Sequence, residues 1–324
     1  MKIAFLGLES WQKDVFTLAF PKDTIFYSLK SSPKDVEILV VFVHDALTAK
    51  MMQRFPKLQF LATMSTGYDH IDLQECRKRG IKVSNVPVYG ENTVAEFTFA
   101  LMLGLSRKLM ACVERTRQGS FELQGLRGFD LRGKTLGIVG CGNIGQHVAR
   151  IAQGFEMNIV VFDVHKEVKL AQKLGFHYVD LDTLLKESDI VTLHIPYNQH
   201  THHLIDNAKL KLMKKSAYLI NTSRGAVVDT SALVQALNSN RLAGAGIDVL
   251  EEENYMCEEI TLLTKSKECN LKTIVENHIL REMPKVLLTP HNAFNTQEAL
   301  MRILQTTIDN IKAFKKGRQI NSIR

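Results

Sequence analysis

Residues 135–145 read Thr-Leu-Gly-Ile-Val-Gly-Cys-Gly-Asn-Ile-Gly, an apolar run followed by glycines at 140, 142 and 145. The apolar run is typical of a buried strand, and residues 144–153 have the apolar spacing of a helix. In such a strand–turn–helix the glycines permit a tight turn, close approach of the backbone to a pyrophosphate, and tight packing of the helix. The stretch therefore predicts a parallel α/β domain in which Gly140, Gly142 and Gly145 seat a dinucleotide at a helix N-terminus.

An acidic residue supports this prediction. Asp163 follows the next predicted strand and lies 18 positions after Gly145. This is near the spacing at which an acid accepts hydrogen bonds from ribose hydroxyls. Because the same carboxylate would repel a 2′-phosphate, Asp163 favours NAD over NADP. The alternative is an ordinary α/β domain with a glycine-rich turn and a surface Asp, which the combination of strand, glycines and acid disfavours.

Similar apolar runs lie on both sides of this stretch and alternate with amphipathic segments, as in parallel α/β layers. The predicted strands are 2–8, 24–29, 38–43, 58–62 and 82–85 upstream, and 158–162, 190–194, 217–221, 244–249 and 286–288 downstream. The predicted helices are 11–20, 71–79, 93–116, 144–153, 181–188, 231–237 and 296–314. Asn92 is placed to cap the long helix 93–116. A linker rich in Gly, Arg and polar residues, 118–134, separates the two series and indicates two α/β units.

The composition indicates a folded protein with an excess of basic residues. At 324 residues the chain can form two domains of about 100 to 200 residues each. Lys and Arg outnumber Asp and Glu by 41 to 34, but they are dispersed apart from a cluster at 312–318, and no aromatic platform accompanies them, so no nucleic-acid partner is expected. No run approaches the roughly 18 apolar residues that cross a bilayer, so no membrane association is expected. The five cysteines include no CxxC pair and favour a reducing compartment, and the cytoplasm is the expected location.

Three residues in the C-terminal half could together bind and reduce a 2-oxo acid. Arg224 follows the predicted strand 217–221, and its planar cation can grip a carboxylate and polarise a carbonyl. His291 suits the protonation of the carbonyl oxygen, because imidazole titrates near neutral pH. Glu253 is the candidate partner that would orient the His291 ring, although 38 positions separate them. A structural Arg and a structural His are the alternatives, but such a trio beside a dinucleotide site favours a dehydrogenase.

With these residues in place, the chain resembles the NAD-dependent D-2-hydroxyacid dehydrogenases, in particular their D-lactate dehydrogenase branch. The motifs that carry the resemblance are 137–145, 193–196, 220–225, 248–249 and 289–291, together with 66–72, 85–89 and 94–96. They cover nearly the whole chain. The resemblance implies two Rossmann-like parallel-sheet α/β domains, with an NAD-binding domain, 101–295, inserted into a discontinuous substrate domain, 1–100 plus 296–324. It also implies NAD as cofactor, a small 2-oxo or 2-hydroxy acid as substrate, and a homodimer.

The resemblance further implies roles for single residues. Arg224, Glu253 and His291 would be catalytic, with His291 as the acid and base. The residues that would contact NAD are Gly140, Gly142, Asn143, Ile144, Gly145, Asp163, Ile195, Pro196, Thr222, Ser223 and Asp248. The residues that would contact substrate are Ser65, Thr66 and Gly67, through backbone N–H groups, and the pocket residues Tyr89 and Phe294. No metal site is implied.

The segment between Glu253 and His291 departs from the family pattern. Many relatives have Glu-Pro after the Asp-Val pair and reach Pro-His sooner, whereas 43 positions separate Asp248 from His291 here, a length that resembles the D-lactate branch. Three consecutive glutamates, 251–253, leave the register of the acid open, and Glu253 is chosen because it lies five positions after Asp248, as the resemblance to the D-lactate branch implies. The sequence Asn-Ala-Phe-Asn at 292–295 is also unusual and leaves the exact substrate open.

The predicted reaction is reversible hydride transfer between NADH and a small 2-oxo acid, with pyruvate to D-lactate as the first choice. Glycerate, hydroxyisocaproate or phosphite are alternative substrates within the family. An NAD-sensing, corepressor-like binding protein is the alternative from another class, and the presence of all three candidate catalytic residues disfavours it. Two other features are interpreted as structural: His200, His202 and His203 as a polar turn rather than a metal site, and Cys141 as small-residue packing rather than a redox thiol.

Overall fold

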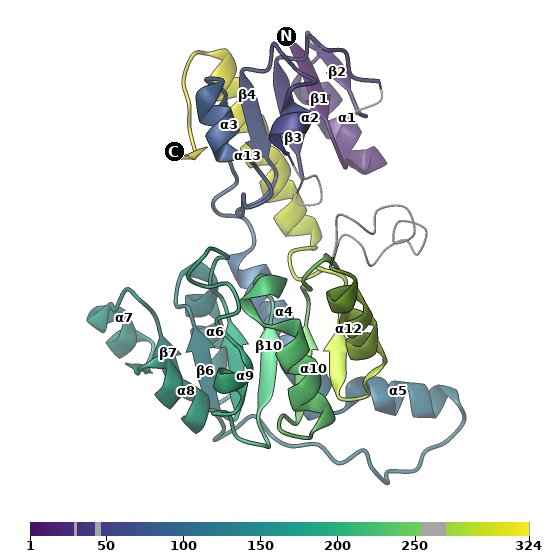
Figure 1. Ribbon diagram of the computed structural model, residues 1–324, viewed down its shortest axis with the longest axis vertical. Coiled ribbons are helices and arrows are strands. Elements are labelled where there is room, and N and C mark those ends of the chain that lie inside the picture. The colour runs from purple at the N-terminus through teal and green to yellow at the C-terminus, as the bar shows by residue number, and fades with distance from the viewer. Residues whose placement is uncertain (29–30, 43–46, 254–269, 324) are drawn as a thin grey trace. The chain divides into compact units, whose positions relative to one another are not determined.

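Two compact units make up the computed structural model, which describes residues 1–28, 31–42, 47–253 and 270–323 (Figure 1). Unit 1 comprises Met1–Gly90 and Asn295–Arg324, and unit 2 comprises Glu91–Phe294. Each unit contains one sheet with helices, so the predicted fold class is confirmed. The predicted strand ends at Leu29 and Val43 lie outside the described residues, as do 254–269 in the insertion between Glu252 and Lys285.

Unit 1 is built on a six-stranded sheet with the order β13-β5-β4-β3-β1-β2. Strands β1 to β5 are parallel, and Ile38–Val41 shows the continuous buried apolar run of a strand that is covered on both faces. The edge strand β13 pairs antiparallel with β5, which the sequence analysis did not predict. The elements of unit 1 are β1 (Lys2–Phe5), α1 (Ser10–Ala19), β2 (Thr24–Phe26), β3 (Ile38–Val41), α2 (Ala49–Met52), β4 (Phe60–Thr63), α3 (Leu73–Lys78), β5 (Lys82–Ser84), α13 (Gln297–Lys315) and β13 (Ser322–Ile323).

Unit 2 is built on a seven-stranded parallel sheet with the order β12-β11-β10-β9-β6-β7-β8. The chain proceeds from β6 to one edge through β7 and β8, then crosses to β9 and proceeds to the other edge. This is the doubly wound arrangement of dinucleotide-binding domains. Its elements are α4 (Glu91–Ser106), α5 (Leu109–Arg117), β6 (Thr135–Val139), α6 (Asn143–Gly154), β7 (Asn158–Phe162), α7 (Val168–Lys173), β8 (His177–Tyr178), α8 (Leu181–Glu187), β9 (Ile190–Leu193), α9 (Asn207–Leu210), β10 (Tyr218–Asn221), the 3-10 helix η1 (Gly225–Val227), α10 (Thr230–Asn238), β11 (Gly244–Ile247), α12 (Leu271–Glu282) and β12 (Val286–Leu288).

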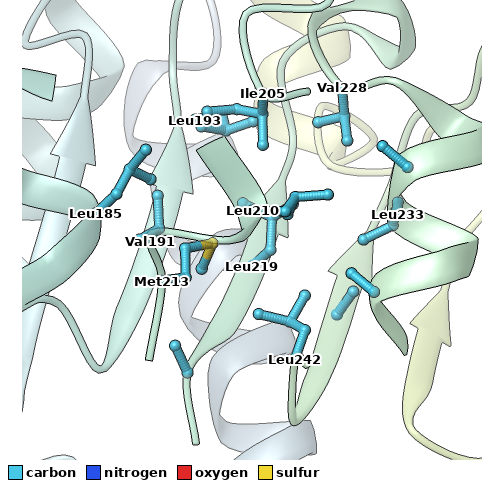
Figure 2. Close-up of a cluster of buried hydrophobic side chains, with 14 of the residues drawn as sticks. Leu185, Val191, Leu193, Ile205, Leu210, Met213, Leu219, Val228, Leu233 and Leu242 are labelled. Carbon is cyan, nitrogen blue, oxygen red and sulfur yellow. The ribbon is translucent and has the colours of Figure 1, made fainter. Parts of the chain in front are cut away.

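Side chains of this sheet alternate between two hydrophobic layers, one on each face. Val191 and Leu193 of β9 belong to the layer formed with α8, α9 and α10, whereas Ile190 packs with residues of α4 and α6. Figure 2 shows the first layer, in which Leu219 of β10 and Leu233 of α10 also lie. Each fully buried leucine contributes about 2 kcal/mol relative to an exposed one. The sheet is therefore held from both faces, which fixes the points where its strands end.

The single helix predicted over 93–116 is wrong, because the chain forms two helices, α4 and α5. Lys108 between them has a left-handed backbone with φ +50°. The Ser106 carbonyl, which a continuous helix would pair with the N–H four residues later, accepts instead from the N–H of Phe129 at 3.0 Å. The predicted cap is also wrong: Asn92 lies inside the first turn of α4, where its side chain donates to Glu96 at 3.1 Å.

Helix α4 lies wholly within unit 2, where it packs against α6 and the strands β10 and β11. The first stretch of unit 1 therefore ends at Gly90, whereas the domain boundary predicted at residue 100 falls inside this helix. The second crossing between the units lies at Phe294 and Asn295, one residue from the predicted boundary at 296. Continuous packing of α4 explains the difference, because a boundary between compact units falls where few contacts cross.

Candidate active site

The strand order of unit 2 reverses between β6 and β9, which are neighbours in the sheet although β7 and β8 lie between them in the sequence. Ligands of open α/β sheets bind beyond the carboxyl ends of the strands at such a reversal. The glycine loop follows β6, and the segment containing Ile195 and Pro196 follows β9. Two predicted cofactor segments therefore border the same point of the sheet.

The glycines of the loop meet different constraints. A Cβ on Gly140, where φ is +92°, would lie 2.7 Å from the His194 carbonyl oxygen, and a Cβ on Gly145 would lie 2.2 Å from the Gly140 carbonyl oxygen. These neighbours are backbone atoms, so the close approach of β6, α6 and the segment after β9 requires glycine at both positions. A Cβ on Gly142, the N-cap of α6, would meet nothing within 4 Å. The helix N-terminus at Gly142 thus has the open, side-chain-free approach that a pyrophosphate needs.

Asp163 lies directly after β7 and beside this loop. Its Oδ2 accepts from the Cys141 N–H at 2.6 Å, and its Oδ1 accepts from the His165 N–H at 2.8 Å. A carboxylate can accept further bonds, so these two leave Asp163 able to receive ribose hydroxyls. Burial, with a smaller contribution from Asp163, raises the pKa of the Cys141 thiol to about 11. Cys141 is therefore a thiol at neutral pH, which supports its interpretation as a packing residue.

Arg224 lies after β10 in a loop that Asn221 shapes. The buried Asn221 side chain donates to the Arg224 carbonyl at 2.9 Å and accepts from the N–H and hydroxyl of Ser223 at 3.0 and 2.8 Å. Arg224 Nη1 donates to the Ser223 carbonyl at 2.8 Å, and the Thr222 and Thr98 hydroxyls lie 3.0 Å apart. These contacts fix the loop that carries Arg224 at the carboxyl end of β10.

Gly225 brings this loop against the turn that follows β11. A Cβ on Gly225 would lie 2.0 Å from the Leu250 carbonyl carbon and 2.3 Å from the Glu251 nitrogen. The two backbone segments therefore touch, and they can do so only because residue 225 has no side chain. Arg224 and Glu253 lie one and two residues from this contact.

Glu253 and His291 meet despite their separation in the sequence: His291 Nδ1 lies 2.8 Å from Glu253 Oε1. Of the other two glutamates in this run, Glu251 is bonded to His203 and Thr230, and Glu252 has a left-handed backbone with φ +54°. Glu253 is thus the glutamate whose contact with His291 the structure records. Its role in chemistry stays a prediction.

Arg224, Glu253 and His291 follow three neighbouring strands, β10, β11 and β12, at the same edge of one sheet. Parallel strands lie about 4.8 Å apart, so residues just beyond their carboxyl ends lie within reach of a small ligand. The sequence predicts strands at β11 and β12 but carries no signal for their pairing. Adjacency of the strands explains how a trio spread over 68 positions shares one edge.

Asp248 anchors the His291 turn, a role that the sequence alone does not indicate. Its buried carboxylate accepts from the Thr289 hydroxyl at 2.5 Å and from the N–H groups of Asn292 and Ala293 at 2.8 and 2.9 Å. Its carbonyl accepts from the His291 N–H at 2.8 Å. His291 has φ +51°, which is uncommon for a residue with a side chain, and these bonds hold it there. The predicted contact of Asp248 with NAD stays a prediction.

The remaining predicted substrate residues belong to unit 1. The Ser65 hydroxyl donates to the Gly67 carbonyl at 2.6 Å, and the Thr66 hydroxyl donates to the Val86 carbonyl at 2.8 Å. Both hydroxyls turn back onto the chain, which leaves the backbone N–H groups of this loop as its donors for a carboxylate, and their contact with substrate stays a prediction. Tyr89 lies one residue before the end of this stretch of unit 1.

Phe294, at the end of unit 2, packs edge-on against the His291 ring, with centroids 6.1 Å apart and an interplanar angle of 80°. It therefore borders the proposed proton donor, as a pocket wall would. The polar turn around His200 and His203 contains no metal-binding group of three side chains, and the described part of the chain contains none elsewhere. Among the described residues, no helix is both long and apolar enough to cross a bilayer.

A family model described as D-isomer specific 2-hydroxyacid dehydrogenase, NAD binding domain, matches residues 99–293. The chain belongs to the D-isomer specific 2-hydroxyacid dehydrogenases. The glyoxylate reductase of Thermococcus litoralis is 39% identical to this dehydrogenase over 291 residues, 88% of this chain and 82% of the relative. The D-lactate dehydrogenase of Aquifex aeolicus, solved with NAD and lactic acid, is 36% identical with a TM-score of 0.87, covering 97% of this chain and 96% of its own. The apo D-lactate dehydrogenase of Escherichia coli is 31% identical with a TM-score of 0.82, and all of both chains is covered.

This dehydrogenase uses NAD. The residues at the strand reversal fit that cofactor: Gly142 leaves the helix N-terminus open to a pyrophosphate, and Asp163 places a carboxylate beside the glycine loop. The predictions of family, enzyme class and cofactor are therefore confirmed.

Proposed function

We propose that this D-2-hydroxyacid dehydrogenase interconverts pyruvate and D-lactate. The observation that carries the proposal is the 2.8 Å contact between His291 and Glu253 beside the loop of Arg224. A 2-oxo acid brings a carboxylate, and its carbonyl oxygen gains negative charge during reduction. A cation and a proton donor at one edge of the sheet meet both needs.

Each residue of the trio has a distinct task in this proposal. Arg224 binds the substrate and polarises its carbonyl through the planar guanidinium. Glu253 at Nδ1 orients the His291 ring and assigns the proton transfer to Nε2. NADH supplies the hydride that reduces the carbonyl carbon. His291 gives its proton to the carbonyl oxygen as the alcohol forms, and takes it back in the reverse direction.

The choice of pyruvate over glyoxylate rests on the length of the connection between Glu253 and His291 and on the Phe294 side chain beside His291. Two solved D-lactate dehydrogenases align with at least 97% of this chain, and the long connection between Glu253 and His291 resembles that branch. Phe294 beside His291 offers an apolar surface for the methyl group that glyoxylate lacks. One carbon in an apolar pocket is worth about 1 to 3 kcal/mol, so pyruvate should exceed glyoxylate in kcat/KM by about tenfold or more.

The test is NADH oxidation with pyruvate, 2-oxobutyrate, hydroxypyruvate and glyoxylate, with the configuration of the lactate determined. The expected result is D-lactate and the highest kcat/KM for pyruvate. His291→Ala should lower kcat by about 10² to 10⁴-fold and keep NADH binding. A higher kcat/KM for glyoxylate would overturn the substrate assignment alone. Binding of NADH without turnover of any 2-oxo acid would overturn the enzymatic proposal and leave the NAD-sensing alternative.

The proposal includes a homodimer, which the exposed apolar face of α5 supports. None of the nine residues of α5 is buried, and Leu109, Met110 and Val113 are 54%, 59% and 37% exposed. Phe121 and Leu123 in the following segment are 82% and 83% exposed. Such a patch is typical of a protein interface. Sedimentation should show that the native protein is a dimer and that the double substitution Phe121→Asp with Leu123→Asp converts it to a monomer. A monomeric native protein would refute the homodimer.

A cytoplasmic location, proposed on the cysteine pattern, completes the proposal.

A further inference from the structure

A second imidazole–carboxylate pair lies two residues from Glu253. His203 Nε2 is 2.7 Å from Glu251 Oε1, and the side chains are 34% and 15% exposed. The other oxygen of Glu251 accepts from the N–H and hydroxyl of Thr230 at 3.1 and 2.5 Å. The proposed chemical steps do not use this pair.

Glu251 connects several elements around the proposed trio. Its carboxylate reaches the turn after β9 and the first residue of α10, and its carbonyl accepts from the side chain of the buried Asn277 of α12 at 2.7 Å. A carboxylate at the N-terminus of α10 is also favoured by the helix dipole. Glu251 is therefore held from three directions before the chain reaches Glu253.

The turn from Glu251 to Glu253 depends on these bonds. The chain passes through Glu252 with φ +54°, a conformation that is unfavourable for a residue with a Cβ. Such a conformation persists where the surroundings impose it. The bonds to Glu251 hold the start of the turn, and the bond to His291 lies at its end.

His203 is itself tied to the segment that carries Arg224. Its N–H donates to the Ala226 carbonyl at 2.8 Å, and its backbone is left-handed with φ +50°. The ring of His202 stacks on the His203 ring, with centroids 3.9 Å apart and an interplanar angle of 22°, which orients that ring. His203 thus connects the two segments that Gly225 brings into contact: its ring bonds to Glu251, and its backbone N–H bonds to Ala226.

We propose that His203 and Glu251 are positioning residues that set the placement of Glu253 against His291 and Arg224. This inference rests on the proposed function, because it assigns the pair a part in that reaction. The opposing interpretation is that the pair stabilises the fold and has no effect on turnover. If the pair positions Glu253, a substitution in it lowers kcat. If the pair only stabilises the fold, the substitution lowers thermal stability and leaves kcat unchanged.

The test compares three variants with wild-type protein. His203→Phe keeps a planar ring for stacking but removes the hydrogen bond to Glu251, and His203→Gln restores a donor. His200→Phe is the matched control, since His200 is an exposed histidine of the same turn that bonds to neighbouring polar side chains. For each variant the measurements are kcat and KM for pyruvate, the Kd for NADH, and Tm.

His203→Phe should lower kcat by about 10 to 100-fold, as a displacement near 1 Å does, with the Kd for NADH unchanged. His203→Gln should recover most of kcat, and His200→Phe should match wild type. A wild-type kcat in His203→Phe, or a loss that His203→Gln does not recover, would overturn the proposal. If His203→Phe does not fold, the test uses Glu251→Gln, which keeps the size of the side chain. It should likewise lower kcat and leave the Kd for NADH unchanged.

A second readout separates this inference from the proposed function. Crystal structures of wild type and His203→Phe should show the Glu253–His291 distance lengthened beyond hydrogen-bonding range in the variant alone. If wild type reduces no 2-oxo acid, the proposed function fails, and this distance still decides whether the pair positions Glu253. An unchanged distance would refute the positioning role whatever the substrate is.

Discussion

Replacing Gly225 with alanine tests the contact that joins the Arg224 loop to the turn carrying Glu253. The added Cβ would lie 2.0 Å from the Leu250 carbonyl carbon, whereas ordinary van der Waals contact begins at 3.4 Å. The opposing atoms are backbone, so the two segments must separate by about 1 Å or more rather than repack. Overpacking of this kind costs about 1 to 3 kcal/mol of stability, and a 1 Å error in catalytic geometry costs about 10²-fold in rate.

The assay is steady-state kinetics with pyruvate, together with thermal unfolding and NADH binding. Gly225→Ala should lose about 100-fold in kcat with a smaller change in the Kd for NADH, because the glycine loop lies after a different strand and keeps its shape. Gly154→Ala is the matched control: its Cβ would meet nothing within 4 Å, and it lies at the end of helix α6, where alanine is tolerated. If Gly225→Ala kept wild-type kcat, the backbone contact would not position the trio and the reasoning would be refuted.

Three further substitutions test other parts of the site. Gly142→Ala places a methyl group where no protein atom lies within 4 Å, so Tm should not change. The methyl group would obstruct the pyrophosphate, so calorimetry should show the Kd for NADH raised at least about tenfold. An unchanged Kd would mean that the loop does not hold the pyrophosphate. Burial lowers the pKa of His194 to about 3, so this residue stays neutral in the folded state while the unfolded chain takes up its proton below pH 6.5. Wild-type stability should therefore fall by about 1.4 kcal/mol per pH unit between pH 6 and 4 relative to His194→Gln in urea unfolding, and parallel pH profiles would contradict a neutral His194 ring. Asp248→Asn replaces one acceptor oxygen by a donor facing the His291 turn, so it should cost about 1 to 3 kcal/mol in urea unfolding and lower kcat, and a variant equal to wild type in both would show that the turn does not need the carboxylate.

The sequence predicted most strands of unit 2, and its central strands β6, β9, β10 and β11 are almost entirely buried, as their apolar runs indicate. The predicted ranges 158–162 and 286–288 coincide with β7 and β12. Short elements were missed: α2 and α9 have four residues each, and β8 and β13 have two, so none can show a period. The break between α4 and α5 was missed because it depends on a residue more than 20 positions away. The Phe129 N–H donates to the Ser106 carbonyl, which a continuous helix would use.

The candidate site was predictable at the level of residue types, because a cation, an acid and an imidazole after predicted strands indicate one chemistry. The choice of Glu253 among three glutamates came from the spacing that the resemblance to the D-lactate branch implies, and the structure places Glu253 in contact with His291. The bonds of Asp248 to the His291 turn could not be foreseen, since they join residues more than 40 positions apart. The pairing of His203 with Glu251 could not be foreseen for the same reason, because 48 positions separate the two residues and only the fold brings them together.

The adjacency of β10, β11 and β12 has a consequence for how this enzyme family can vary. The distance between Glu253 and His291 is set by the spacing of neighbouring strands, about 4.8 Å, and not by the number of residues that connect them. The closure entropy of a loop rises slowly with its length, by only about 0.6 kcal/mol for each doubling. Insertions and deletions between β11 and β12 can therefore accumulate over evolution without disturbing the acid–base pair, so the length of this connection can diverge while the reaction is retained.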